Sequence, residues 1–114
     1  MNFSYSIESR ETCKIVSITG SISVTSIESF ERLISSLTDI GNVIINMEKV
    51  ESVTSSGLNT LIDIVLSAKS KNHRVLLLRP GKLFLEMIEI VRDYDYFNII
   101  ETVDEGLAKL KFYT

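Results

Sequence analysis

The chain has 114 residues, of which 45% are apolar and 24% are charged, and its formal net charge is −3. This length suits one domain that buries its own core without disulfides or metals. The acidic balance argues against a nucleic-acid partner, because phosphate binding normally needs a basic patch. Here the cations are scattered, apart from a small cluster at Lys69, Lys71 and Arg74.

The single cysteine, Cys13, cannot form an internal disulfide, which fits a reducing compartment. Residues 1–11 lack the apolar core of a signal peptide. No segment approaches the roughly 20 apolar residues that span a bilayer. We therefore expect one domain over residues 1–114 in the cytoplasm, with no membrane partner.

The first half of the chain predicts two strands and a helix. Residues 3–7, FSYSI, alternate as a half-exposed strand does, and residues 13–20, CKIVSITG, are rich in β-branched residues. Thr25 and Glu28 have the spacing of a capping box, and Gly41 is placed to end or follow the helix. Apolar residues recur at helical spacing behind that capping box: Ile27, Phe30, Leu33, Ile34 and Leu37.

The second half predicts three more strands and three more helices. The apolar runs NVIINM and RVLLLR are typical of strands covered on both faces. A helix is expected over residues 80–93, a short strand over 96–100, and a last helix after a capping box at Thr102 and Glu105. The order β-β-α-β-α-β-α-β-α indicates an α/β fold with a mixed, mostly parallel sheet of about five strands, about four helices and an antiparallel first strand.

A helix is also expected from about Ser55 to Ser70, directly after a strand. We expect its N-terminus to lie at the loop of residues 54–57, TSSG, with one side of the helix packed on the sheet. The expected apolar stripe is Leu58, Leu61, Ile62, Val65 and Leu66, and the expected polar side is Thr60, Asp63, Ser67 and Ser70.

The hydroxyl residues at this helix start have two compatible interpretations. Serine and threonine are preferred N-caps, and glycine allows a tight turn. A helix N-terminus also tolerates a phosphate, because its N–H groups are free and its dipole end is positive. Since a phosphoserine adds about −1.5 to −2 charge, the same loop could be a cap and a phosphorylation switch.

Residues 42–78, NVIINMEKVESVTSSGLNTLIDIVLSAKSKNHRVLLL, resemble the STAS domain, in particular the bacterial anti-sigma factor antagonists. VSITGSI, with Gly20, is similar to the family's strand that ends in glycine. FNIIETVDEGLAKL is similar to its closing strand and helix. The resemblance covers nearly the whole chain and agrees with the expected strand order.

The resemblance implies a function without enzymatic activity. Such proteins bind an anti-sigma factor that is also a serine kinase, and this binding frees the sigma factor. The kinase phosphorylates the first serine of the motif, and a metal-dependent serine phosphatase restores it. The implied acceptor is Ser55, with Ser56 and Thr54 as alternatives. The expected partner-binding residues are Thr54, Ser55, Ser56, Gly57, Asn59, Ser21, Ser23, Phe84 and Leu85.

Three positions depart from the family pattern. Thr54 and Asn46 stand where aspartate is usual, and Ser21-Ile22-Ser23 lacks the usual acidic residue. Glu48 and Glu51 supply acid nearby, but at a different spacing. The departures keep open a second hypothesis, a STAS scaffold or adaptor that is not phosphorylated and binds its partner constitutively.

The remaining candidates favour no catalytic residue, cofactor or metal. His73 is expected to be a solvated turn residue, and Cys13 a small buried hydrophobe. We find no paired carboxylates with a base and no Ser/His arrangement. In the helix after Pro80, Met87, Ile88, Ile90 and Val91 are expected mostly in the core. Phe84 and Leu85 add more apolar surface than one buried face needs, so either one of them is exposed and contacts a partner or the helix has a broad buried face.

Overall fold

The computed structural model describes residues 3–90 and 96–112. Strands and helices follow one another in the predicted order, and the helix over residues 55–70 has the predicted bounds. The elements are β1 (Phe3–Ser9), β2 (Cys13–Ile22), α1 (Ile27–Thr38), β3 (Asn42–Val53), α2 (Ser55–Ser70), β4 (Val75–Leu78), α3 (Lys82–Ile90), β5 (Asn98–Ile100) and α4 (Val103–Lys111).

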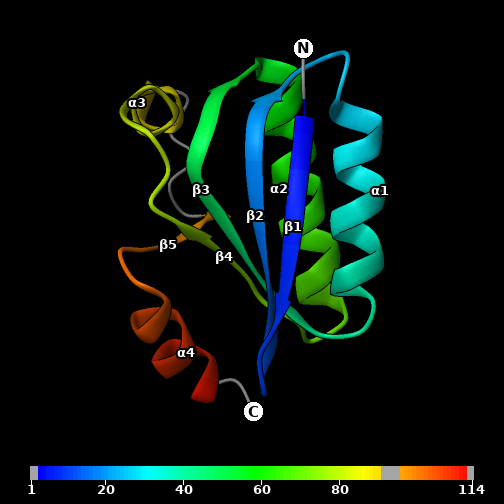
Figure 1. Ribbon diagram of the computed structural model, residues 1–114, viewed down its shortest axis with the longest axis vertical. Helices are drawn as coiled ribbons and strands as arrows, with labels where there is room; N and C mark the ends of the chain where they lie inside the picture. The colour runs from blue at the N-terminus through cyan, green and yellow to red at the C-terminus, as the bar shows by residue number, and fades with distance from the viewer. Residues whose placement is uncertain (1–2, 91–95, 113–114) are drawn as a thin grey trace.

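The five strands form one sheet in the order β1-β2-β3-β4-β5 (Figure 1). β1 pairs antiparallel with β2, and the other neighbours are parallel, which confirms the predicted mixed sheet. β3 is longer than the six residues expected, because it continues beside the end of β2 after two shifts in register. The second shift follows Gly20, whose φ of 107° is accessible mainly to glycine.

Helices cover both faces of the sheet: α1 and α2 lie on one side and α4 on the other (Figure 1). Alternate residues of β3 therefore enter different cores. Val43 and Ile45 pack in the larger cluster with α1, α2 and α3, whereas Ile44 packs in the smaller one with Leu110 of α4. This two-sided burial explains why the predicted strand reads as a continuous apolar run.

The start of α1 differs from the capping-box prediction. The N-cap is Ser26 rather than Thr25, and its side chain makes no capping bond. The Ser26 hydroxyl instead accepts from the Ser23 backbone N–H (3.0 Å) and donates to the Ser21 carbonyl (2.6 Å). The Ser26 hydroxyl therefore bonds to the end of β2 and the loop after it and does not cap α1. The second capping box is confirmed in part, because Thr102 accepts from the Glu105 N–H at 3.0 Å.

The buried face of α2 is rotated from the predicted stripe. Ile64 and Ala68 are buried together with Leu58 and Leu61, whereas Leu66 is 47% exposed. The apolar residues of α2 span more than one face, so their spacing alone favoured the wrong edge of the stripe. Packing against α1 and β3 decides which side is covered.

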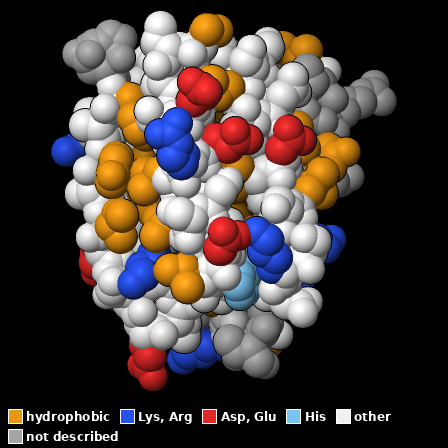
Figure 2. All heavy atoms as spheres, turned by 90° about the vertical axis from the view of Figure 1, so that its right-hand side faces the viewer, with side chains coloured by type: hydrophobic (Ala, Val, Ile, Leu, Met, Phe, Trp, Pro, Cys, Tyr) orange, Lys and Arg blue, Asp and Glu red, His pale blue; other side chains and the backbone are white. Residues whose placement is uncertain are grey.

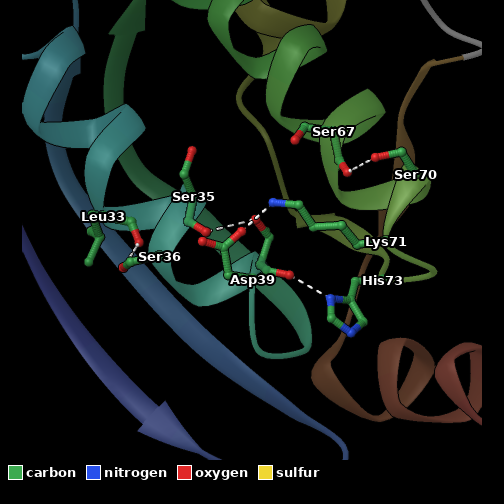
Figure 3. Close-up of polar contacts among 9 residues, drawn as sticks. Leu33, Ser35, Ser36, Asp39, Ser67, Ser70, Lys71 and His73 are labelled. Atoms are coloured by element: carbon green, nitrogen blue, oxygen red, sulfur yellow. Dashed lines mark hydrogen bonds and ion pairs between the residues drawn. The ribbon is translucent and has the colours of Figure 1, made fainter.

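His73 was predicted to be a solvated turn residue, but its side chain is half-buried. Its Nδ1 lies 2.5 Å from the Thr38 carbonyl oxygen at the end of α1 (Figure 3). A carbonyl can only accept, so Nδ1 carries the hydrogen in this arrangement. Lys71 makes an ion pair with Asp39 next to it. The C-terminal ends of α1 and α2 are thereby held together.

Within residues 3–90 and 96–112, no helix is long and apolar enough to cross a membrane.

We predict different costs for two leucine truncations on α2. Leu61→Ala should lower the free energy of unfolding by about 3 kcal/mol, because Leu61 is fully buried. Leu66→Ala should cost less than about 1 kcal/mol, since Leu66 is 47% exposed. Urea unfolding followed by circular dichroism measures both. Equal costs would contradict the observed orientation of α2.

Candidate functional site

The start of α2 is organised by Thr54. Thr54 is the N-cap, with φ −78° and ψ 170°, and its Oγ1 accepts from the Gly57 N–H at 3.1 Å. The capping interpretation is therefore confirmed, and threonine rather than serine supplies the oxygen. An aspartate at this position would supply the same acceptor. Ser55 and Ser56 follow as the first two helical residues.

The first turn of α2 lies directly against the end of β2. The Thr54 backbone N–H donates to the Ile22 carbonyl at 3.0 Å. A Cβ on Gly57 would lie 2.7 Å from that same carbonyl oxygen. Gly57 is therefore needed for close approach, not for the tight turn suggested by the sequence, because it lies within the helix without a positive φ.

Ser55 and Ser56 are both exposed. Among the described residues, neither side-chain hydroxyl has a hydrogen-bond partner, so both are available to another molecule. The cap uses the Gly57 N–H, and the N–H groups of the two serines belong to the unpaired set at every helix start. An anionic group on Ser55 would thus sit at the positive end of the helix.

Further hydroxyl groups line the same end of the sheet. Ser21 faces Ser52 across the β2–β3 ladder, and the Ser52 hydroxyl lies 3.0 Å from that of Ser21. Ser23, half-buried in the following loop, lies 3.2 Å from the Thr25 hydroxyl. The predicted residues Ser21 and Ser23 are thus brought near Thr54. Ser52 was missed, because its place depends on the register shifts between the two strands.

The site carries little acidic charge. The first turn of α2 contains no acidic residue. The Glu48 carboxylate forms an ion pair with Arg79, with 3.6 Å between Oε2 and Nε. It is therefore engaged with Arg79 and not with the serines. Asn46 is also engaged elsewhere, because its side-chain oxygen accepts from the Glu48 N–H at 3.0 Å. Glu51 is exposed and remains the acidic residue nearest in sequence to Ser55.

A groove of about 330 Å³ lies between the C-terminal end of β3 and the start of α3. Glu51 and Ser52 form one wall, and Lys82 and Leu83 form the other. Leu83 is 71% exposed, so the groove has an apolar rim. The groove extends the serine-lined end of the sheet toward α3.

Of the two alternatives for Phe84 and Leu85, the structure favours the broad buried face. Phe84 is 5% exposed and packs edge-on against Phe97, with ring centroids 5.7 Å apart. Leu85 is half-buried against the larger core. The buried face of α3 follows Phe84 and Ile88, one turn apart, and leaves Leu83 outside.

The expected core residues of α3 are confirmed only in part. Ile88 is fully buried and Met87 packs partly against the core, but Ile90 is 80% exposed. Ile90 lies two residues after Ile88, on the far side of the helix. Val91 and the rest of the expected helix to residue 93 lie outside the described residues.

Two further features concern Cys13 and the grouping of metal-ligating side chains. Cys13 is buried as predicted, and this burial raises the pKa of its thiol, which keeps it in the less nucleophilic protonated form. Across residues 3–90 and 96–112, no three His, Cys, Asp or Glu side chains are grouped as metal ligands.

The family model of the STAS domain matches residues 4–106. The chain therefore belongs to the STAS domain family, as its motif and strand order indicated. No curated protein sequence matches the chain.

Solved structures share the fold over nearly the full chain. An anti-sigma factor antagonist from Mycobacterium paratuberculosis is 18% identical, with TM-score 0.79 and coverage of 96% of this chain and 95% of that one. A putative anti-sigma factor antagonist from Thermotoga maritima is 17% identical, with TM-score 0.83 and coverage of 96% and 94%. The phosphorylated form of the Bacillus cell fate determinant SpoIIAA is 15% identical, with TM-score 0.71 and coverage of 94% and 99%. These likenesses show the shared fold.

Removing the cap should destabilise the site without a change in charge. Thr54→Ala should lower the free energy of unfolding by about 1 kcal/mol, because the Gly57 N–H loses its acceptor. Thr54→Ser keeps the hydroxyl and should stay within about 0.5 kcal/mol of the parent protein. Chemical denaturation of the three proteins measures the difference. A Thr54→Ser variant as unstable as Thr54→Ala would assign the effect to the methyl group instead.

Proposed function

We propose that the protein is an anti-sigma factor antagonist regulated by phosphorylation of Ser55. In this proposal it binds an anti-sigma factor serine kinase, and the bound kinase releases its sigma factor. The observation that carries the proposal is the exposed Ser55 hydroxyl at the first position of α2, next to the Thr54 cap. Family membership supports it.

The position of Ser55 suits a reversible charge switch. A phosphate there would face solvent and the N-terminal dipole of α2, so it should leave the fold intact. It would also add a charge of about −1.5 to −2 to a surface with little acidic charge of its own. The physical consequence is a change in binding rather than in folding. SpoIIAA shares this fold and has been solved in its phosphorylated form, which supports the proposal that the fold can carry a phosphate.

The proposed partner surface is the end of the sheet around α2. It comprises Thr54, Ser55, Ser56, Gly57 and Asn59, with Ser21 and Ser23 beside them. Asn59 is exposed, one turn after Ser55. On α3 we assign the contact to Leu83 and its groove, because Phe84 is buried.

The rest of the cycle falls to other proteins. The exposure of Ser55 would give a metal-dependent serine phosphatase access to the phosphate. The protein itself acts by binding and not as an enzyme. The proposed binding unit is the domain over residues 1–114.

A specific observation favours a second candidate, the constitutive scaffold or adaptor. The first turn of α2 contains no acidic residue, and Thr54 occupies the position where aspartate is usual. Without that carboxylate, a kinase loses one group that could orient the serine hydroxyl. A scaffold would retain its partner in a pulldown whether or not ATP is present, whereas a switched antagonist would release it.

Phosphorylation should map to Ser55. We expect one phosphate after incubation with purified anti-sigma factor serine kinases of the same organism and ATP, located by tandem mass spectrometry. Ser55→Ala should remove it. Unmodified Ser55, Ser56 and Thr54 after incubation with every such kinase would exclude the switch and favour the scaffold.

A fixed charge at Ser55 should imitate the phosphate. Ser55→Asp should weaken kinase binding at least about tenfold, while Ser55→Ala should bind like the parent protein. Ser67→Asp is the matched control, since Ser67 is exposed near the other end of α2. Isothermal titration calorimetry measures each affinity. Equal affinities of the two Ser55 variants would contradict a charge switch at this position.

A further inference from the structure

The outer edge of β1 is an unprotected strand edge. β1 is the first strand of the sheet, and no described strand pairs with its outer side. It runs for seven residues, Phe3–Ser9, in unbroken register with β2. Its sequence, FSYSIES, contains neither the proline nor the lysine that commonly guard such edges. The opposite edge is blunted, because β5 has only three residues.

β1 also carries exposed apolar side chains on the side of α1. Tyr5 faces Ile18 and Ile7 faces Val16 across the ladder, so both point toward the larger core. Phe3 reaches that core and packs edge-on against Phe30 of α1. Tyr5 and Ile7 remain exposed, at 52% and 44%. Figure 2, which views the α1 side, shows hydrophobic side chains open to solvent there.

We infer that β1 binds β1 of a second copy of this chain, antiparallel and in one register, in which Ser6 lies opposite Ser6. The two-fold axis then passes between the two Ser6 residues and joins two five-stranded sheets into one. Phe3 lies opposite Ser9 of the second copy, and Ser4 lies opposite Glu8. In this register odd-numbered residues lie opposite odd-numbered ones and even-numbered residues opposite even-numbered ones. The backbone N–H and C=O groups that point away from β2 on one strand therefore face the outward-pointing groups of the other strand, as an antiparallel ladder requires.

The side chains of β1 are self-complementary in this register. Tyr5 lies opposite Ile7 of the second copy, and this pair occurs twice, which gives two aromatic–β-branched contacts on the exposed apolar side. On the other side Ser4 can donate to Glu8, and Glu8 meets no like charge. Shifting the register by two residues in either direction leaves two residues of each strand unpaired. One of these shifts only exchanges the Tyr5–Ile7 pairs for Phe3–Ile7 pairs, so the fuller pairing of the edge is what favours Ser6 opposite Ser6. The match of β1 with itself is the reason to name a second copy as the occupant.

This dimer is independent of the proposed switch. The edge that pairs is β1, whereas Ser55 begins α2 after β3. Failure of the dimer would leave the phosphorylation proposal intact, and the reverse also holds. Where both hold, one particle carries two Ser55 sites.

Disulfide trapping tests both the dimer and its register. Ser6→Cys should crosslink to itself under mild oxidation, because Cα atoms of opposite residues lie about 4.5–5.5 Å apart, within disulfide range. Ser4→Cys alone and Glu8→Cys alone should not, since each would be about four residues, roughly 13 Å, from its own copy. A mixture of Ser4→Cys and Glu8→Cys proteins should form the heterodimer. The parent protein is the control, because its Cys13 is buried.

Sedimentation velocity over a range of concentrations tests the dimer without crosslinks. The parent protein should shift from monomer to dimer as its concentration rises. Ile7→Lys removes both Tyr5–Ile7 pairs and should raise the dimer dissociation constant roughly tenfold, with an unchanged circular dichroism spectrum. Equal crosslinking of all three single cysteine variants, preferential crosslinking of Ser4→Cys, or a parent protein that stays monomeric at every concentration would overturn the inference.

Discussion

The close approach of α2 to the end of β2 is the constraint on which the rest of the site depends. The Ile22 carbonyl accepts from the Thr54 N–H, and a Cβ on Gly57 would lie only 2.7 Å from the same oxygen. Glycine is therefore required by the contact itself. Because the first turn of α2 is held there, Ser55 and Ser56 are directed away from the sheet and into solvent.

The parallel pairing of β2 and β3 produces this contact. Two register shifts carry β3 past the six-residue apolar run and bring Val53 opposite Ile22. α2 starts immediately afterwards at Ser55, close in sequence to Ser52, whose hydroxyl lies 3.0 Å from that of Ser21. In the proposed function, a phosphate on Ser55 would change the charge of this surface while the two cores below it stay packed. Binding would then change without a loss of folding free energy.

Much of the fold was predictable because burial leaves a strong periodic signal. The runs NVIINM and RVLLLR predicted strands covered on two faces, and alternating strands and helices predicted the parallel sheet. The failures lie where several faces are apolar or several hydroxyls compete. α2 and α3 carry more apolar residues than one face holds, so Leu66 and Ile90 were placed wrongly and the burial of Phe84 was left open. The N-cap of α1 is Ser26 rather than Thr25, and the Ser26 hydroxyl bonds to the backbone of Ser21 and Ser23 instead of capping the helix.

The sequence by itself determined the order of the elements, the STAS motif and the position of Ser55 at a helix start. These features depend on local spacing and on residue types that act at short range. Only the tertiary structure decided that Thr54 is the cap, that Gly57 is needed for close approach and that Leu83 of α3 is exposed whereas Phe84 is buried. The tertiary structure also showed that no strand of residues 3–90 and 96–112 pairs with the outer edge of β1, because an edge is a property of strand order in space. Such features depend on contacts between residues far apart in the chain.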